Sequence, residues 1–484
     1  MTRSAYLGID VGTGGVRCAL QALDGTCVAS ASEPLRDAEV LGLPPGRHEQ
    51  RPEAWWPPLA ACIRKIVAAA GADSIAALSV DSTSGTVVFL DGGGRPLRPA
   101  IMYNDTRAAE QAARINAAAA DFTARHGSRF GSSFALAKVL WVKEHEPDAF
   151  ERAAMICHAA DYLAGRLRGS FGVTDTSNAL KMGCDLFDAS WPGFIEGLGV
   201  PLRKLPRLVA PGTPTGGVCR SAAAETGLRP DTAVVAGCTD GTAGFLASGA
   251  AGEGDWASTL GTTLVLRGIS RDVVKDPAGR VYCHRHPDGW WLPGSAASVG
   301  GECLAHHFPG RDLAGLDRQA MELGHTDALC YPLVRRGERF PFVNPAAEGF
   351  TVCEAAGGPL EGAELHLACL EGVAFVERWG LELFAGLGAS TAGRIFATGG
   401  GAKSTFWLQV RATVLGRELC VPAQAGSEVG AAALAAAADC GSVSEACRRM
   451  VRLAGVVRPD ASRTALYDAK YRRFRELCTA RGYV

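Results

Sequence analysis

The sequence feature that most constrains the fold is the segment Tyr6–Leu20, which reads YLGIDVGTGGVRCAL. Two apolar runs, Tyr6–Val11 and Val16–Leu20, flank a short stretch rich in glycine, and this pattern predicts two buried strands joined by a tight turn. A strand end is a rigid support, so Asp10 is expected at a fixed point beside the turn. The glycines of Gly12–Gly15 predict a backbone that takes positive φ and directs its N–H groups toward an anion.

Such a turn suits a polyphosphate. The residues expected to bind phosphate oxygens are Gly12, Thr13 and Gly14, with the Thr13 hydroxyl as an additional donor. Ionised Asp10 only accepts hydrogen bonds and repels phosphate, so a hydrated Mg²⁺ is its expected partner. The local sequence is also compatible with a plain turn in which the aspartate binds nearby backbone, and this alternative stays open.

Two other phosphate-binding motifs do not fit. Arg17 stands where the dinucleotide fingerprint G-x-G-x-x-G requires its third glycine, which disfavours a nicotinamide oxidoreductase. The nearest match to a Walker A motif, Ala397–Ser404 (ATGGGAKS), has alanine at both required glycine positions. The hairpin therefore predicts a different class of nucleotide-binding protein.

Length and charge narrow the class of partner. A chain of 484 residues predicts two or three domains. With 49 basic and 50 acidic residues, neither a nucleic-acid groove nor a basic membrane-binding surface is indicated, and a small-molecule partner is expected. The 16 cysteines are scattered without a C-x-x-C pair, which predicts reduced thiols in a cytoplasmic protein. The composition is also compatible with a homodimer.

Small hydroxylated residues follow the strand expected over Ser74–Val80, in the sequence DSTSGT (Asp81–Thr86). Such residues at a strand break can line a pocket without filling it. A second polar group closes the segment that follows the strand Val87–Leu90. The residues expected to hydrogen-bond a polyol are Ser82, Thr83, Ser84, Asn104, Asp105 and Arg107. A helix N-cap at Asp105 is the alternative for the second group.

A second informative stretch is Gly237–Ala250, which reads GCTDGTAGFLASGA. The strand predicted over Ala233–Gly237 delivers Asp240 to the start of a helix. The helix dipole and backbone N–H groups hold a carboxylate ionised and oriented there. An N-cap aspartate explains this much without a function, yet small residues follow Asp240, as expected where a ligand comes close.

The segment Asp255–Gly268 (DWASTLGTTLVLRG) repeats the opening pattern of strand, Gly-Thr turn and returning strand. An internal repeat of this kind predicts two related α/β domains. Thr262 and Thr263 are expected to donate to phosphates. Further on, Thr398–Ser404 (TGGGAKS) predicts a glycine-rich bend between a strand and a helix, which lets a base or an α-phosphate approach the backbone.

Taken in order, six segments resemble the FGGY family of carbohydrate kinases, and the resemblance covers almost the whole chain. They are Gly8–Gly14, Asn104–Ala108, Thr239–Gly241, Gly261–Thr263, Glu371–Ala374 and Gly399–Ser404. The resemblance implies two ribonuclease-H-like domains of the actin and hexokinase superfamily, with ATP and sugar in the cleft that separates them. Residues 1–245 would form the N-terminal domain, with the sugar site and the first phosphate turn, and residues 246–484 the ATP-binding domain.

The family's roles can be transferred to matching positions. Asp10 resembles the Mg²⁺-associated carboxylate. Asp240 resembles the catalytic base that takes the proton of the sugar hydroxyl, and it is also expected to contact the sugar and the metal. The nucleotide-binding positions implied by the resemblance are Gly12, Thr13 and Gly14 in the first turn, Gly261, Thr262 and Thr263 in the second, and Gly400, Gly401 and Lys403 in the bend.

The residues Thr83, Ser84 and Gly85 bear on substrate choice. Xylulose kinases of the family usually carry Met-His-Gly at this loop and glycerol kinases Arg-Glu, whereas the present sequence is similar to the D-ribulose kinase subgroup. The resemblance thus implies transfer of the γ-phosphoryl group of ATP to the 5-hydroxyl of D-ribulose. Xylulose or another polyol is the alternative substrate, and a non-catalytic actin-like ATPase or sugar sensor is the alternative from another class.

Overall fold

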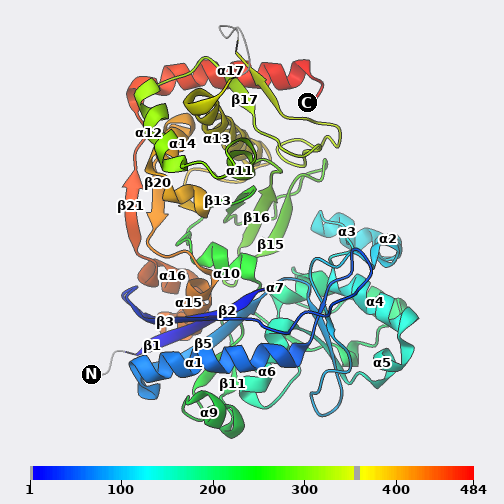
Figure 1. Ribbon diagram of the computed structural model, residues 1–484. Coiled ribbons are helices and arrows are strands. Elements are labelled where there is room, and N and C mark those ends of the chain that lie inside the picture. Colours follow the sequence, from blue (N-terminus) through cyan, green and yellow to red (C-terminus); the bar gives the residue numbers. More distant parts are fainter. Residues whose placement is uncertain (1–3, 354–359) are drawn as a thin grey trace. The chain divides into compact units, whose positions relative to one another are not determined.

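The computed structural model describes residues 4–353 and 360–484. Contacts divide the chain into two compact units, whose helices and strands are labelled in Figure 1. Unit 1 runs to Ala251 and also includes residues 284–289 and 424–452, and unit 2 comprises residues 252–283, 290–423 and 453–484. Both units mix helices and strands, so the predicted α/β fold class is confirmed.

A six-stranded sheet with the order β11-β12-β5-β1-β2-β3 forms the centre of unit 1. Its strands are β1 (Ala5–Val11), β2 (Gly15–Ala22), β3 (Cys27–Pro34), β5 (Ile75–Ser82), β11 (Pro214–Gly217) and β12 (Ala233–Val235). β1 pairs with β2 antiparallel, which confirms the predicted hairpin, and with β5 in parallel. The parallel register sets Asp10 beside Asp81 at the carboxyl ends of the two strands.

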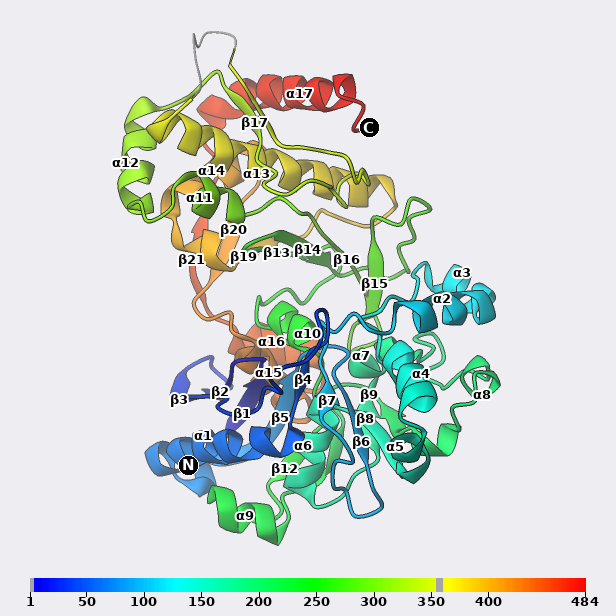
Figure 2. The same ribbon diagram turned by 45° about the vertical axis from the view of Figure 1, so that its right-hand side comes forward.

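A smaller sheet of unit 1 has the order β4-β7-β6-β8, and its strands can be followed in Figure 2. These strands are β4 (Glu49–Gln50), β6 (Val87–Leu90), β7 (Ala100–Ile101) and β8 (Met155–His158), and a separate pair consists of β9 (Val173–Asp175) and β10 (Arg207–Val209). The β6 bounds are those expected from the sequence. The predicted sugar ligands therefore follow two strands, β5 and β7, that belong to different sheets of the same unit.

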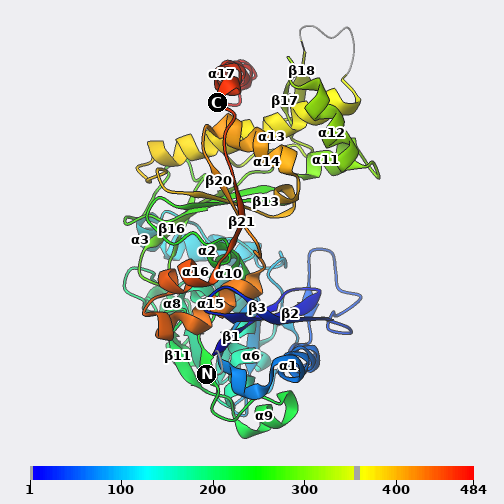
Figure 3. The same ribbon diagram turned by 90° about the vertical axis from the view of Figure 1, so that its left-hand side faces the viewer.

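Helices cover both faces of the six-stranded sheet. The helices of unit 1 are α1 (Trp56–Ala70), α2 (Ala109–Ala118), α3 (Ala120–His126), α4 (Ala135–His145), α5 (Pro147–Arg152), α6 (Ala159–Arg168), α7 (Thr176–Ala179), α8 (Phe194–Gly197), α9 (Arg220–Thr226), α10 (Asp240–Leu246), α15 (Ser427–Cys440) and α16 (Val443–Met450). Short 3₁₀ turns add η1 (Pro52–Trp55), η2 (Ala72–Ser74), η3 (Leu180–Met182) and η4 (Leu202–Lys204). α1 lies on one face and α15 on the other (Figure 3).

The alanine-rich sequence from Glu428 to Ala438 predicts a helix that packs closely against a sheet or another helix, and α15 does both. A Cβ atom at Gly8 of β1 would come within 1.7 Å of the Glu428 carbonyl oxygen, and one at Gly430 within 1.9 Å of the Ala243 carbonyl oxygen in α10. Glycine is required at both positions because the backbones touch. This close approach fixes α10, and with it Asp240, against the end of the sheet.

Unit 2 repeats the strand arrangement of unit 1. Its larger sheet has the order β15-β16-β14-β13-β19-β20-β21, formed by β13 (Trp256–Leu260), β14 (Leu264–Gly268), β15 (Tyr282–Arg285), β16 (Trp291–Ala296), β19 (Ile395–Thr398), β20 (Leu419–Pro422) and β21 (Leu453–Val457). β13 pairs with β14 antiparallel and with β19 in parallel, as β1 does with β2 and β5. The internal repeat predicted from the two Gly-Thr turns is therefore confirmed as a repeated strand order.

Helices α13 and α14 cover one face of this sheet, with α17 beyond them (Figures 1 and 3). The remaining elements of unit 2 are α11 (Glu302–His307), α12 (Leu313–Leu323), β17 (Leu329–Tyr331), β18 (Phe350–Val352), α13 (Gly362–Gly386), η5 (Gly400–Lys403), α14 (Thr405–Leu415), η6 (Ala461–Arg463) and α17 (Thr464–Ala480). Arg411 of α14 is fully buried and donates to both carboxylate oxygens of Glu377 in α13, at 2.7 and 2.9 Å, and to the Ser258 hydroxyl of β13. This pair links the helices to the sheet.

Some local expectations were wrong. The sequence from Ala109 to Arg125 predicts a single helix, but the structure interrupts it at Ala119, which separates α2 from α3. The sequence after the glycine at position 169 predicts a loop that contains Thr174, Asp175 and Asn178. In the structure these residues lie in β9 and α7, where Asp175 caps the helix by accepting from the Asn178 N–H. All sixteen cysteines are free thiols, as expected. Among the described residues, no helix combines the length and apolar character needed to cross a membrane.

Candidate functional site

Asp10 lies near the end of β1 with only 1% of its surface exposed. Arg17, its direct partner on β2, donates through Nε to the Oδ2 atom of Asp10 at 3.0 Å and through its terminal nitrogen to the same oxygen. The same Nε lies 3.8 Å from the Glu428 carboxylate at the start of α15. Arg17 thus compensates two carboxylates at the end of the sheet that holds the first Gly-Thr turn.

The turn after β1 differs from the expectation in its backbone. None of its glycines has positive φ. Gly15 is needed for another reason, because a Cβ atom there would come within 2.9 Å of the Glu33 carbonyl oxygen on β3. Gly12 is half-buried, and Thr13 and Gly14 are exposed, with no atom within 4 Å of a Cβ built at Gly14. The turn therefore offers open backbone, and phosphate binding by these three residues stays a prediction.

Asp81 is a buried carboxylate that the sequence reasoning did not single out. It is the last residue but one of β5, lies beside Asp10, is 0% exposed, and neither of its oxygens has a hydrogen-bond partner among the described residues. Burial raises the pKa of Asp81 well above its usual range, and the charges of Asp10, Asp240 and Glu428 raise it further. A carboxylate in this position is expected to gain an electropositive partner when the site is filled.

Asp240 occupies the first position of α10, and Thr239 rather than Asp240 is the N-cap. The Gly241 N–H donates to the Oδ1 atom of Asp240 at 2.6 Å. The Ser177 hydroxyl of α7 lies 3.0 Å from the hydroxyls of both Thr239 and Thr242, which flank Asp240 in the sequence. A β-bridge joins Thr239 to Ser82 at the end of β5, so Asp240 emerges beside the segment that carries the predicted sugar loop.

The predicted sugar loop, Thr83–Gly85, is held by its own hydroxyls and by a lysine. The hydroxyls of Thr83 and Thr86 lie 2.7 Å apart, and Lys181 donates from Nζ to the Ser84 carbonyl oxygen at 2.9 Å. Burial lowers the pKa of Lys181, whereas the Asp240 carboxylate acts to raise it. Lys181 thus holds the backbone of the sugar loop, and its charge is attracted by that of the predicted catalytic base. Just before this loop, the buried Ser82 hydroxyl has no hydrogen-bond partner among the described residues.

Asn104 and Asp105 differ in environment. Asn104 is exposed, whereas Asp105 is fully buried and accepts from the His48 N–H at 2.7 Å and from Arg107 at 2.9 and 2.7 Å. Burial acts to raise the pKa of Asp105, but these hydrogen bonds outweigh it and the pKa is lowered. Asp105 is not a helix N-cap, because α2 begins at Ala109. Contact of Asp105 with sugar stays a prediction. Its carboxylate oxygens already accept hydrogen bonds from the His48 N–H and from the Arg107 side chain.

In unit 2, the second Gly-Thr turn joins β13 to β14. Thr262 is exposed, and Gly261 and Thr263 are half-buried. The Gly261 carbonyl oxygen accepts from the Gly301 N–H at 2.8 Å. A Cβ atom at Gly300 would come within 2.5 Å of the Thr262 carbonyl oxygen. Gly300 and Gly301 therefore both pack directly against the backbone of this turn.

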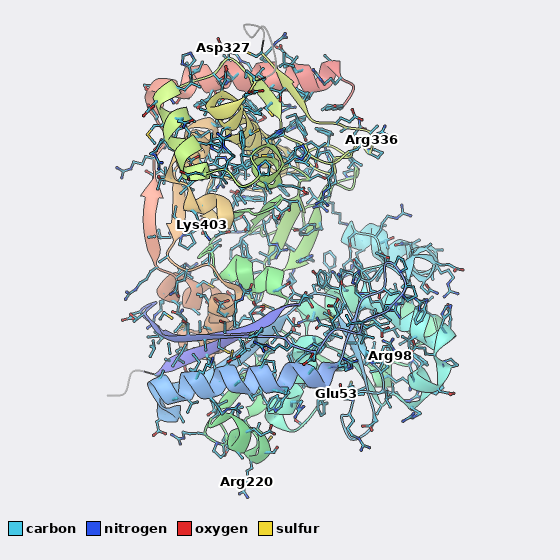
Figure 4. All side chains as sticks on the ribbon, viewed as in Figure 1. Glu53, Arg98, Arg220, Asp327, Arg336 and Lys403 are labelled. Carbon is cyan, nitrogen blue, oxygen red and sulfur yellow. The ribbon has the colours of Figure 1, made fainter. Side chains whose placement is uncertain are left out.

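The glycine-rich bend approaches the same turn from the other side. Gly399 has a φ of +82°, and a Cβ atom there would come within 2.5 Å of the Leu260 carbonyl oxygen, the residue before Gly261. Gly400 is exposed, Gly401 is buried against Leu260, and exposed Lys403 ends η5 (Figure 4). The structure thus brings together the predicted nucleotide-binding residues of unit 2, and their contact with nucleotide stays a prediction.

The carboxylates of unit 1 fit a hydrated divalent cation better than a fully protein-bound one. No three histidine, cysteine, aspartate or glutamate side chains in the described ranges are arranged to bind an ion by themselves. Mg²⁺ usually keeps several waters and takes one or two carboxylates together with substrate phosphates. Asp10, with the unpartnered oxygens of Asp81 beside it, has the chemistry to hold such an ion.

Comparisons with known proteins agree with this chemistry. Residues 5–247 match the N-terminal domain, and residues 257–438 the C-terminal domain, of the FGGY family of carbohydrate kinases. The chain belongs to the FGGY family of carbohydrate kinases. Membership shows that it is a sugar kinase with a small-molecule sugar substrate, and it implies ATP as phosphoryl donor, with Mg²⁺ as the typical metal.

Individual relatives cover nearly the whole chain. The xylulose kinase of Escherichia coli is 29% identical over 98% of both chains, and that of Streptomyces rubiginosus is 31% identical over 89% of this chain and 87% of the relative. The crystal structure of xylulose kinase from Rhodospirillum rubrum has a TM-score of 0.86 and 29% identity over 98% of both chains. That of a xyloylose kinase from Brucella ovis has a TM-score of 0.87 and 26% identity over 98% of this chain and 99% of the other.

Three features of the site were not recognised in the sequence, although signals were present. Asp81 ends a strand in the same way as Asp10, and carboxyl ends of parallel neighbours meet at one edge. Lys181 stands in a short helical turn flanked by apolar residues, which is an unusual place for an unpaired cation. The consecutive glycines Gly300 and Gly301 resemble the glycine-rich segments Gly12–Gly15 and Thr398–Ser404, which are predicted to bind phosphate.

Proposed function

We propose that this sugar kinase transfers the γ-phosphoryl group of ATP to the terminal hydroxyl of a ketopentose, with D-ribulose as the first candidate. The observation that carries the proposal is the bridge from Ser82 to Thr239, which sets the loop Thr83–Gly85 beside Asp240. Ser84 presents a small hydroxylated side chain there, so the loop itself is expected to leave the pocket wide and to add no charge to it. That character suits the hydroxyls of an open-chain ketose.

The residues of the chain would act by positioning and by charge. Phosphoryl transfer needs an aligned acceptor hydroxyl and stabilisation of phosphate charge more than covalent chemistry. Asp240, oriented by the Gly241 N–H, accepts the proton of the sugar hydroxyl. Mg²⁺, when bound near Asp10, supplies positive charge to the phosphates. The turns at Thr13 and Thr262 are proposed to donate hydrogen bonds to phosphate oxygens.

D-Xylulose is the second candidate. It is favoured by the relatives described above, which are named xylulose kinases and are 29% to 31% identical to this chain. The two ketopentoses differ only in the configuration of one hydroxyl, so a change of the loop residues at positions 83 and 84 can alter the preference between them. A single small difference of this kind in a pocket is expected to be worth about 10- to 200-fold in kcat/KM.

A substrate panel tests the proposal. Sugar-dependent ADP formation is measured with D-ribulose, D-xylulose, L-ribulose, pentitols and glycerol at saturating ATP and Mg²⁺. We expect the highest kcat/KM with D-ribulose. A higher value with D-xylulose would replace the first candidate by the second, and turnover with glycerol alone would overturn the ketopentose proposal.

Ser84 provides a direct test of the sugar loop. We expect Ser84→Leu to raise the KM for the ketopentose about tenfold or more, because the larger side chain removes space and a hydroxyl from the pocket. The KM for ATP should change by less than about twofold, since the loop is proposed to contact only sugar. Steady-state kinetics with each substrate varied in turn measures both values. An equal rise in the two KM values would contradict the role of Ser84 in sugar binding.

A further inference from the structure

Lys138 is a buried cation that none of the assignments above uses. It lies in α4 with 0% of its surface exposed, among apolar neighbours on the same helix. Burial and the positive charge of Lys181 together lower the pKa of Lys138 to about 7, although the Asp105 carboxylate acts to raise it. A cation is kept in such a place only when hydrogen bonds compensate its loss of water.

The compensation comes from three separate segments of the chain. Lys138 Nζ donates to the carbonyl oxygens of Gly85 at 2.9 Å, Met102 at 2.7 Å and Ser133 at 3.3 Å. An ammonium has three N–H donors, and each meets one backbone acceptor. Gly85 ends the predicted sugar loop, and Met102 lies two residues before Asn104. The amine thus binds the backbone of both segments that are predicted to contact sugar, the loop at Thr83–Gly85 and the segment that leads to Asn104 and Asp105.

The fit around Gly85 shows that this arrangement is tight. Gly85 has a φ of +91°, and a Cβ atom there would come within 2.6 Å of the Ser133 carbonyl oxygen and 2.8 Å of the Lys181 side chain. Only glycine adopts this conformation without strain in the space available. With its carbonyl bound by Lys138 and the preceding carbonyl of Ser84 bound by Lys181, the two consecutive peptide groups that follow the Ser84 side chain are both held.

We infer that Lys138 is a positioning residue that pre-organises the sugar loop, and that it sets the affinity for the sugar without touching it. The inference rests on the proposed function. Without the ammonium, the segments at Gly85, Met102 and Ser133 lose their common donor, and the cost of ordering them is transferred to sugar binding. The nucleotide-binding turns contain none of these residues, so the affinity for ATP is expected to be independent of Lys138.

Lys138→Met and Lys138→Arg test the inference. Loss of charge-assisted hydrogen bonds of this kind is expected to raise the KM for sugar at least tenfold in Lys138→Met, with the KM for ATP changed by less than about twofold. Lys138→Arg keeps a cation with several donors and is expected to recover part of the sugar affinity. Hydrogen exchange followed by mass spectrometry should show faster exchange over residues 83–86 and 102–106 in the methionine variant.

Lys204 offers a matched control within the same unit. It is also buried, and its Nζ donates to the carbonyl oxygens of Phe150, Glu151 and Ala153 at 3.0, 2.9 and 2.6 Å. None of these residues belongs to the predicted sugar segments. We expect Lys204→Met to destabilise the protein to a similar degree while the KM for sugar and the exchange over residues 83–86 stay at the wild-type values.

Several results would overturn the inference. It fails if Lys138→Met raises the two KM values equally, if exchange over residues 83–86 is unchanged, or if Lys204→Met raises the KM for sugar as strongly. These outcomes differ from failure of the proposed function, which would appear as a wild-type enzyme that phosphorylates no ketopentose. In that event the exchange comparison of the two methionine variants still decides whether Lys138 orders the loop.

Discussion

Replacement of Asp240 by asparagine is expected to lower kcat by about 10²-fold or more, which is the scale of losing a general base. The amide has nearly the same shape and can still accept a hydrogen bond from the Gly241 N–H, but it cannot take the proton of the sugar hydroxyl. Binding of sugar and ATP should be nearly unchanged, because the proton is transferred only during the reaction. Single-turnover rates at saturating sugar and ATP, with binding measured by calorimetry, separate the two quantities.

Asp148 provides the control for this substitution. It is an exposed aspartate in the first turn of α5, so it has the same relation to a helix dipole as Asp240 has in α10. Asp148→Asn is expected to leave kcat unchanged, with an effect on stability of less than about 1 kcal/mol. Near-normal turnover in Asp240→Asn would contradict the role as base. A parallel loss in Asp148→Asn would show that the helix dipole, and not proton transfer, is responsible.

The supersecondary structure of this chain could be predicted from local patterns. The hairpin of β1 and β2 follows from two apolar runs around a glycine-rich turn, and the β13 and β14 hairpin repeats it. The position of Asp240 at the start of a helix follows from a short strand and the small residues after it. These features depend on a few neighbouring residues, so a single sequence is sufficient to reveal them.

Long-range placements could not be predicted in this way. α15 lies 419 or more positions after Gly8 in the sequence, yet it packs on β1, where the backbones of Gly8 and Glu428 come close together. Likewise, the sequence shows Lys138 as a polar residue between the apolar residues of the first turns of α4. Its function as a common donor depends on three carbonyl groups from different segments. Backbone acceptors carry no signature in the sequence, because every residue has one.

The positive φ expected within Gly12–Gly15 was wrong for a physical reason. The turn closes through a hydrogen bond from the Gly12 N–H to the Gly15 carbonyl oxygen at 3.0 Å, without any left-handed residue. Glycine is nonetheless needed at position 15 because β3 passes close to it, and at position 14 it leaves open space. Glycine therefore serves two purposes in this turn. At position 15 it allows β3 to pack closely, and at position 14 it leaves the backbone open to solvent.

Replacement of Asp10 by asparagine is expected to lower kcat/KM at physiological Mg²⁺ by about 10²- to 10³-fold, the scale of losing one preorganised charge in a catalytic site. The variant should also need a higher Mg²⁺ concentration for half-maximal rate, because the amide is a weaker ligand for a hard cation. Binding of Mn²⁺ to the protein in the presence of ADP, followed by electron paramagnetic resonance, measures the metal affinity without turnover. We expect the Mn²⁺ dissociation constant to rise in this variant, and to rise less in Asp81→Asn.

The ion pair with Arg17 defines the competing explanation. If Asp10 served only to pair with Arg17, whose side chain is 58% exposed, its loss would cost no more than about 1 kcal/mol of stability and leave the metal dependence unchanged. Asp73→Asn is the control for loss of an ion pair alone. Asp73 pairs with Arg229 at the surface, just before the first residue of β5. Unchanged Mn²⁺ affinity in Asp10→Asn would assign this carboxylate to the ion pair alone, because a purely structural partner of Arg17 has no effect on a bound cation.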